Sequence, residues 1–324
     1  MTPRLILVVT DFSVHGNNAL ARAALLSAEH GAALKLAYIH SPGDTSPADA
    51  ATRLAHHALQ LSQTYGISAR AASRIYHSLD ELRPEVTASD LVVWGTAPLR
   101  SFRSFFLGQP VEELIRGAGR PVLVVGRAAQ NPYRNLLVAV DFTETSRGLL
   151  DLSFSFSTTA SVEIFHAVST ANEGKLRYAE VSTRAIKAYR DECRRHAQDR
   201  MFWLTDSFDT RRNRVQSAIA HGDPARQTLV QQERSGSDLI VVGKHPGSTF
   251  SDLFFGSVAG RLLRYLHADD RRADVLVVPH DWQPATRTSA ASRLAAERTG
   301  VNRVRAGAPQ PPRHPNPAAI RGCM

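Results

Sequence analysis

Glycines and a serine are grouped in one stretch of the sequence with a spacing that suits phosphate binding. The stretch VVGKHPGSTFSDLFFGSV, residues 241–258, passes from an apolar run through a glycine-rich loop into a helical pattern, and it holds Gly243, Gly247 and the pair Gly256–Ser257. Glycine lets the backbone approach an anion closely, and the first N–H groups of a helix face such an anion. Pro246 interrupts the loop and has no N–H to donate, so the loop loses one donor.

Two aspartates mark a second place where polar chemistry is expected. Asp11 and Asp141 each follow an apolar run and precede a helical pattern, within Asp-Phe-Ser and Asp-Phe-Thr. Such residues can cap the helix that follows, or they can present a carboxylate to a polar ligand at the edge of a sheet. The sequence leaves both interpretations open. The glycines of residues 241–258 have a structural alternative too, because neither GxxxxGK[ST] nor GxGxxG occurs there and turns also require glycine.

Catalytic and metal-binding patterns are missing from the sequence. There is no GxSxG or HExxH motif, and none of the 13 histidines falls in a metal-ligand spacing. Asp141, His166 and His245 could gather beyond the edge of a sheet and support slow nucleotide hydrolysis, but histidines at strand ends are more often structural. We therefore expect no catalytic residues, no metal ligands and at most slow ATP hydrolysis.

The composition describes a globular chain with a basic tail. Of its 324 residues 43% are hydrophobic and 21% charged, and no apolar run reaches the roughly 18–20 residues that span a bilayer. Cys193 and Cys323 form no disulfide framework, so we expect a cytoplasmic protein without membrane contact. Seven arginines and two acidic residues after His280 account for +5 of the net charge of +9, so nucleic acid is not an expected partner. That tail has almost no large apolar residues beyond Trp282 and Leu294 and is predicted to be disordered.

An internal repeat indicates which elements position these residues. Residues 4–40 align with residues 134–168, each with a basic residue, an apolar strand, Asp-Phe-Ser/Thr, a helical segment and a second apolar strand. Residues 88–125 align with residues 236–279. Apolar strands of about five residues that alternate with amphipathic helices are typical of a parallel sheet covered on both faces. The prediction is α/β: two tandem doubly wound domains, whose ligands lie beyond the carboxyl ends of the strands.

The repeat also sets the expected domain boundaries. We predict a first domain over 1–128, a second over 133–280 and the disordered tail over 281–324. Each domain ends in an apolar VLVV strand, at Val122–Val125 and Val275–Val278. We expect these strands to join the two domains as an intramolecular pseudo-dimer, and a homodimer of the whole chain is left open.

Over nearly all of residues 1–280 the repeat resembles the universal stress protein family. That family has a Rossmann-like fold, and its nucleotide-binding members carry G-x2-G-x9-G-[ST] after the fourth strand and an aspartate after the first. The second copy departs at one of four loop positions, with Gly243, Pro246, Gly256 and Ser257. Its HGDPA segment, residues 221–225, is similar to the family's G-[DN]-P. The first copy departs at two positions, reading Gly95, Pro98, Gly108 and Gln109.

The resemblance implies a stress-response protein that binds an adenine nucleotide, ATP or a similar one, in its second domain and acts as a sensor or regulator. The residues that it assigns to the nucleotide are Asp141, Val168, Gly243, Gly247, Gly256, Ser257 and Val258. The first domain is then structural or serves dimerisation. The alternative is a scaffold that binds no nucleotide and presents a surface to partners. The sequence indicates neither the stress signal nor whether a divalent metal accompanies the nucleotide.

Overall fold

A computed structural model describes residues 2–39, 49–95, 114, 119–157, 159–170, 173, 176, 178–206, 215–244, 258–268, 273–280 and 282. The predicted sites Gly247, Gly256 and Ser257, and the predicted disordered tail, lie outside these residues. Among the described helices, none is both long and apolar enough to cross a membrane.

The chain is built as two halves that repeat one order of elements. The first half contains β1 (Leu5–Thr10), α1 (Val14–His30), β2 (Ala33–Tyr38), α2 (Ala50–Tyr65), β3 (Ala69–Ala71), α3 (Leu79–Ala88), β4 (Leu91–Gly95) and β5 (Val122–Val125). The second half contains β6 (Asn135–Ala139), α6 (Thr145–Phe156), β7 (Ser161–Val168), α8 (Thr183–Asp206), β8 (Val215–His221), α9 (Pro224–Ser235), β9 (Leu239–Lys244), α11 (Val258–Ala268) and β10 (Asp274–Pro279).

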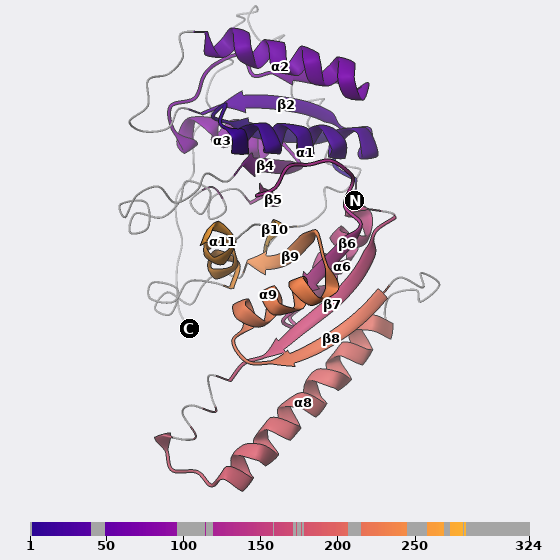
Figure 1. The fold of residues 1–324 in the computed structure, drawn as a ribbon, viewed down its shortest axis with the longest axis vertical. Helices are drawn as coiled ribbons and strands as arrows, with labels where there is room; N and C mark the ends of the chain where they lie inside the picture. Colours follow the sequence, from indigo (N-terminus) through magenta and orange to yellow (C-terminus); the bar gives the residue numbers. More distant parts are fainter. Residues whose placement is uncertain are drawn as a thin grey trace, which may run out of the picture. The chain divides into compact units, whose positions relative to one another are not determined.

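The strands form one sheet of ten, in the order β3-β2-β1-β4-β5-β10-β9-β6-β7-β8. Neighbours within each half are parallel, so each half repeats the same strand order and the predicted α/β fold is confirmed. The halves meet where β5 and β10 pair antiparallel, with Leu123 opposite Leu276 (Figure 1). This pairing confirms the prediction that the two VLVV strands join the halves.

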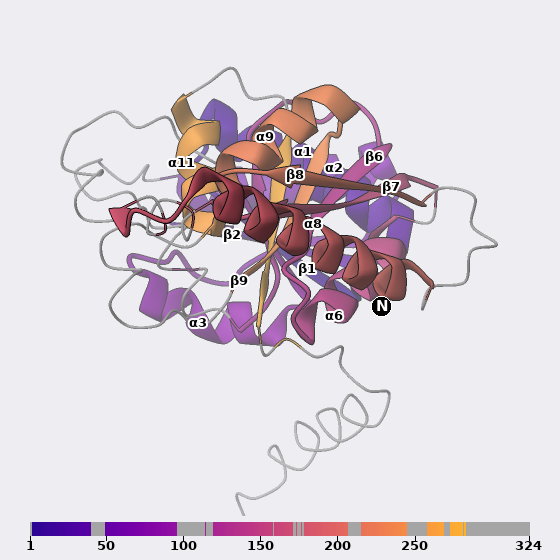
Figure 2. The ribbon, with the colours of Figure 1, turned by 90° about the horizontal axis from the view of Figure 1, so that it is seen from below.

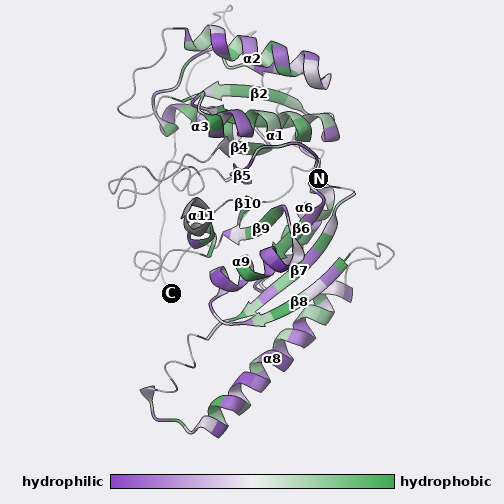
Figure 3. Cartoon of the chain, viewed as in Figure 1, coloured by the Kyte–Doolittle hydropathy of each residue, from purple (hydrophilic) through white to green (hydrophobic). Residues whose placement is uncertain are grey.

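Helices cover both faces of the sheet (Figure 2). On one face, strand residues pack with α1, α2, α6 and Met201 of α8, and on the other they pack with α3, α9 and α11. The central strands are buried on both faces, which explains their continuous apolar sequences. Helix α8 is different, because only a narrow stripe of it is buried and hydrophilic residues lie along much of its length (Figure 3).

Local capping residues fix where the helices begin and end. Ser13 caps α1 by accepting a hydrogen bond from the Gly16 N–H, and Ser78 caps α3 in the same way. Asp223 caps α9, where Pro224 occupies the first position and needs no N–H partner. Gly31 ends α1 in the left-handed conformation that favours glycine. These short signals place the strand ends, and therefore the loops beyond them.

A buried polar cluster ties the halves together beside the β5–β10 pair. Asp274 of β10 accepts hydrogen bonds from the Tyr133 hydroxyl at 2.6 Å and from the Gly126 N–H at 2.9 Å. The Arg22 Nε of α1 lies 3.3 Å from the same carboxylate, and its guanidinium stacks 3.9 Å above the Tyr133 ring. Burial raises the pKa of both Asp274 and Tyr133. The cluster therefore stabilises the contact between the halves only while all of its members remain paired.

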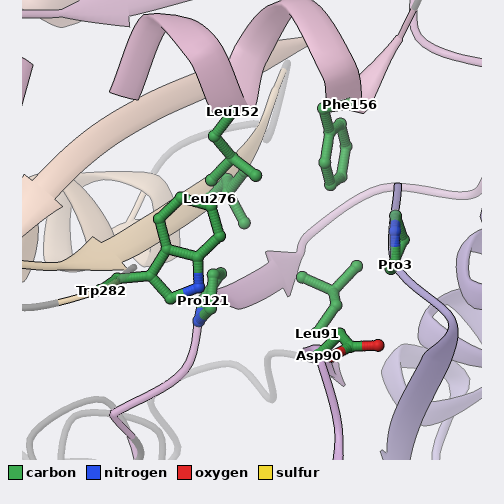
Figure 4. Close-up of a pocket in the computed structure, with 8 residues that line it drawn as sticks. All are labelled: Pro3, Asp90, Leu91, Pro121, Leu152, Phe156, Leu276 and Trp282. Carbon is green, nitrogen blue, oxygen red and sulfur yellow. The ribbon is translucent and has the colours of Figure 1, made fainter. Parts of the chain in front are cut away.

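An apolar cavity lies along the same seam (Figure 4). Both halves line it, through Pro3, Asp90, Leu91, Pro121, Leu152, Phe156, Leu276 and Trp282. The one acidic residue, Asp90, accepts hydrogen bonds from the Arg4 and Leu5 N–H groups and so holds the start of β1. The cavity is consequently a gap in the packing between the halves, and its first-half residues Pro3, Asp90 and Pro121 precede β1, β4 and β5.

Candidate nucleotide site at the carboxyl edge of the second half

Asp141 stands directly beyond β6, at the edge where a doubly wound sheet binds ligands. Its Oδ1 atom accepts hydrogen bonds from the Thr143 N–H at 3.0 Å, the Thr143 hydroxyl at 2.7 Å and the Ser146 hydroxyl at 3.0 Å. The carboxylate thus organises the turn before α6, but it does not cap the helix, because Glu144 holds the capping position and makes no side-chain cap hydrogen bond. In the first half Asp11 Oδ1 accepts one such bond, from the Ser13 N–H. The ligand role of Asp141 stays a prediction.

A phenylalanine in an unusual backbone conformation follows each aspartate. Phe12 and Phe142 have φ angles of 62° and 61°, in the left-handed region that costs a residue with a Cβ about 1–2 kcal/mol. The Phe142 ring packs 4.2 Å from the His166 ring, and Arg200 of α8 donates a hydrogen bond to the Phe142 carbonyl at 2.6 Å. In the first half the Phe12 ring stacks 4.7 Å from Tyr38. Sequence reasoning missed these stacks, although the repeated Asp-Phe was visible.

His166 is a half-buried group near the proposed site. Burial lowers its pKa, against the smaller raising effects of its hydrogen bond to the Val140 carbonyl and of the Asp141 charge. Because a carbonyl oxygen only accepts, the His166 Nδ1 atom at 2.8 Å must carry the proton. The structure thus places Asp141 and His166 at one edge, whereas His245, the third member of the predicted cluster, lies outside the described residues.

Gly95 is the last residue of β4 and Gly243 is the last but one of the corresponding strand β9, yet their surroundings differ. A Cβ on Gly95 would lie 2.2 Å from the His15 carbonyl oxygen, so this glycine is required by the close packing of strand and helix backbones. A Cβ on Gly243 would lie 3.2 Å from the Leu149 side chain, and no other atom of the described residues comes within that distance. The backbone at Gly243 is therefore packed less tightly than that at Gly95.

The other predicted contacts that the structure describes lie at the ends of their elements. Val168 ends β7, and its carbonyl accepts a hydrogen bond from the Gly222 N–H at 3.0 Å. Val258 begins α11. Val168, Asp141 and Gly243 thus lie at the carboxyl ends of the neighbouring strands β7, β6 and β9.

Asp223 links the two helices that begin near this edge. It caps α9 through the Arg226 N–H, and both of its oxygens lie 2.7 Å from the Arg261 guanidinium of α11. Burial favours a higher pKa for Asp223, but its hydrogen bonds with Arg226 and Arg261 outweigh burial and lower the pKa. The HGDPA segment therefore has a structural role, because its aspartate caps α9 and forms an ion pair with Arg261 of α11. Sequence reasoning identified the segment but not Arg261.

A second ion cluster lies beyond β7 and β8. Glu173 is 4% exposed, and its carboxylate contacts Arg190 at 2.6 Å and the His221 Nε2 atom at 2.5 Å. The hydrogen bond from Arg190 is the main reason why the pKa of Glu173 is lowered. No motif surrounds Glu173 in the sequence, so only the folded chain reveals it. Among the described residues no group of three or more His, Cys, Asp or Glu could hold a metal ion.

Comparison with known proteins matches this architecture. A model of the universal stress protein family matches residues 3–126 and again residues 132–281. A universal stress protein from Archaeoglobus fulgidus DSM 4304 is 16% identical with a TM-score of 0.60, over 86% of this chain and 100% of that one.

Two proteins of Pseudomonas aeruginosa are similar to a comparable extent. A putative universal stress protein from strain UCBPP-PA14 is 19% identical with a TM-score of 0.56, over 86% of this chain and 93% of that one. A functionally unknown protein from strain PAO1 is 20% identical with a TM-score of 0.55, over 91% of this chain and 98% of that one. At these identities the likeness concerns the fold. A search of curated proteins gives no match.

Proposed function

This chain belongs to the universal stress protein family, and from that premise we propose that its second half binds an adenine nucleotide, ATP or a similar one, and acts as a sensor or regulator. The family model matches twice, which confirms the resemblance seen in the repeated sequence. We propose the cytoplasm as its compartment, because Cys193 and Cys323 suit a reducing environment.

The difference between the two strand-end glycines carries the proposal. Gly95 packs against the backbone of α1, whereas among the described residues Gly243 meets only the flexible side chain of Leu149. A phosphate can approach the backbone closely only at a glycine that is not already packed against other atoms of the protein. The sequence supports the same choice, because the second half retains Gly256–Ser257 where the first half has Gly108–Gln109.

The proposed orientation places the adenosine end near Asp141 and Val168 and the phosphates near the start of α11. The phosphate contacts are assigned to Gly243, Gly247, Gly256, Ser257 and Val258. Pro246 removes one backbone donor from this loop, at a cost of about 0.5–1.5 kcal/mol of binding free energy. Such a loss weakens a site and does not abolish it.

A scaffold role is the second candidate, and exposed aromatic side chains on α8 favour it. Phe202 is 65% exposed and Trp203 is 71% exposed, and the two rings contact each other edge to face. Large exposed aromatics at one place are typical of contact surfaces. A scaffold of this kind would need no phosphate grip in the loop after β9.

Calorimetry with ATP on the intact chain separates the two candidates. Gly256→Val should abolish binding, because a branched side chain keeps the phosphate from the backbone. Gly108→Val is the matched control at the aligned position of the first half, and it should leave binding unchanged. The opposite result would assign the site to the first half, and a wild-type chain that binds no nucleotide would favour the scaffold.

A further inference from the structure

Positive side chains gather where α9 and α11 begin, at the carboxyl edge of the second half. Arg226 lies in the first turn of α9, Lys244 ends β9 and Arg261 lies in the first turn of α11. Asp223 is the acidic residue that joins them, through its ion pair with Arg261. The four side chains carry a net charge of +2.

Strand alternation places Lys244 on the side of the sheet that faces these helices. Ile240 and Val242, four and two positions earlier, pack in the cluster that contains Ala225 of α9 and Leu262 of α11. Side chains two residues apart in a strand lie on one face. The Lys244 side chain therefore leaves β9 toward the face that carries α9 and α11, directly after Gly243.

The arginines are held at the same place by their contacts. Asp223 accepts the Arg226 N–H at 3.0 Å, and the Arg226 charge helps to lower the pKa of Asp223. The two contacts of 2.7 Å between Asp223 and Arg261 fix the guanidinium beside the beginning of α9. Arg226 is exposed, and the ion pair of Asp223 and Arg261 is about one-third exposed. The charge of Arg226 is thus open to a ligand in solvent, and that of Arg261 is open in part.

The first half carries the opposite charge at the aligned positions. Ser78 takes the capping place of Asp223, since both begin the helix after the third strand of their half. Counted from these caps and from the loop glycines, the aligned residues are two acids and two neutral residues, namely Glu81, Glu113, Ser78 and Thr96. Their net charge is −2. The two halves therefore differ by four charges at these aligned positions of the sequence.

We propose that this basic cluster, made of Arg226, Lys244 and Arg261, selects ligands that carry a chain of two or more phosphates over monophosphates, cyclic phosphates and nucleosides. The inference rests on the proposed nucleotide function, because it deepens the description of the same edge. A polyphosphate spreads several negative charges over a length that separate cations can contact together. A side-chain cation also offsets the backbone donor that Pro246 removes.

The test measures a series of ligands that differ in charge. Calorimetry on the intact chain should give affinities that rise from adenosine and cyclic AMP through AMP and ADP to ATP. Inorganic tripolyphosphate, which has the charge without the base, should bind too. Raising the salt concentration should strongly weaken the binding of ATP and tripolyphosphate, because ions screen exposed charges. It should weaken the binding of adenosine little.

Variants on one helix provide a matched pair. Arg226→Gln should lower the affinity for tripolyphosphate by about fivefold, which is the upper range for one exposed charge pair. It should leave the affinity for adenosine unchanged. Arg234→Gln removes the same charge from the last turn of α9, about 12 Å further along the helix axis. It should change the affinity for neither tripolyphosphate nor adenosine. Lys244→Met should act like Arg226→Gln. It keeps the Asp223–Arg261 pair intact, so a loss of binding would not reflect a damaged helix contact.

The outcomes separate this inference from the proposed function. If no nucleotide binds but tripolyphosphate binds and depends on Arg226, the nucleotide proposal fails and the basic cluster stands. If tripolyphosphate does not bind, or if Arg226→Gln and Arg234→Gln behave alike, the inference is overturned. Equal affinities for ATP and adenosine would also overturn it, and would leave a base-specific nucleotide site in place.

Discussion

The two halves share one framework and differ at the edge where a ligand would bind. Both have the strand order of a doubly wound sheet, and both place Asp-Phe at the end of the first strand with the phenylalanine at positive φ. At the fourth strand they diverge, because Gly95 packs tightly against His15 and Gly243 does not. In a duplicated chain, packing thus preserves a glycine and a turn for reasons unrelated to binding. A retained motif supports a site only where packing leaves it free.

The largest expected effect concerns the seam on which both halves depend. Arg22→Met would leave the buried Asp274 carboxylate without its cation, so we expect a loss of about 3–5 kcal/mol in the free energy of unfolding. Arg83→Met is the control, because Arg83 pairs with Asp80 on an exposed face of α3 and should cost less than about 1 kcal/mol. Chemical denaturation measures both. Similar losses would mean that the seam cluster contributes no more than a surface pair.

That cluster also marks the limit of what the sequence could predict. The repeat and its apolar runs predicted the strands and helices of both halves and the joining of the VLVV strands, because burial of a face leaves a periodic local pattern. The partners of Asp274 do not leave such a pattern. Tyr133 is 141 positions away, and Arg22 belongs to the other half. A buried polar pair formed by distant residues has no spacing to detect, so its members look like ordinary linker or helix residues.

The candidate site was predictable to a similar degree. Asp141 and Gly243 were identified, since they stand at strand ends that the repeat defines. The pairing of Asp223 with Arg261 was not, because it depends on two helices that pack side by side. The stacking of His166 on Phe142 depends in turn on the backbone conformation of Phe142. Sequence patterns therefore located the edge, and the folded chain was needed to show how its charges and rings are held.

Alanine at the two strand-end glycines tests the comparison directly. Gly95→Ala should lower the free energy of unfolding by about 2–3 kcal/mol, because its Cβ would overlap the backbone of His15. Gly243→Ala should cost less than about 1 kcal/mol, because the Leu149 side chain can move by a few tenths of an ångström. Thermal and chemical denaturation give the two values. If Gly243→Ala proves as damaging as Gly95→Ala, Gly243 is also a packing residue and the argument for a free backbone fails.

The pH dependence of stability should distinguish the aromatic stacks. Burial lowers the pKa of His166, so the unfolded chain binds the proton more readily than the folded chain. Stability is then fully present above the unfolded pKa of about 6.5 and is lost as the pH falls below it, by at most about 1.4 kcal/mol per pH unit for one histidine. Tyr38 occupies the equivalent place in the first half, where its ring stacks on that of Phe12.

His166→Tyr makes the second stack resemble the first and should reduce this acid sensitivity. Urea denaturation at several pH values between 5 and 7 measures the slope for both proteins. Part of the slope should remain, since burial lowers the pKa of His30 and His57 as well. An unchanged slope in His166→Tyr would mean that His166 takes up its proton equally well in the folded and unfolded chains.

The smallest expected difference lies between the two arginines that cover the stacks. Arg53 lies 4.5 Å above the Phe12 ring, a cation–π contact worth about 0.5–1 kcal/mol at an exposed site. Arg200 lies 5.7 Å from the Phe142 ring and also donates to the Phe142 carbonyl at 2.6 Å, which holds the strained residue in place. Replacing each by methionine keeps the apolar stem, so Arg200→Met should cost about 1 kcal/mol more than Arg53→Met, the net worth of one hydrogen bond. Thermal denaturation of the two variants measures the difference. Equal losses would show that the positive φ of Phe142 is held by the Asp141 turn itself, and the two halves would then share this feature without distinction.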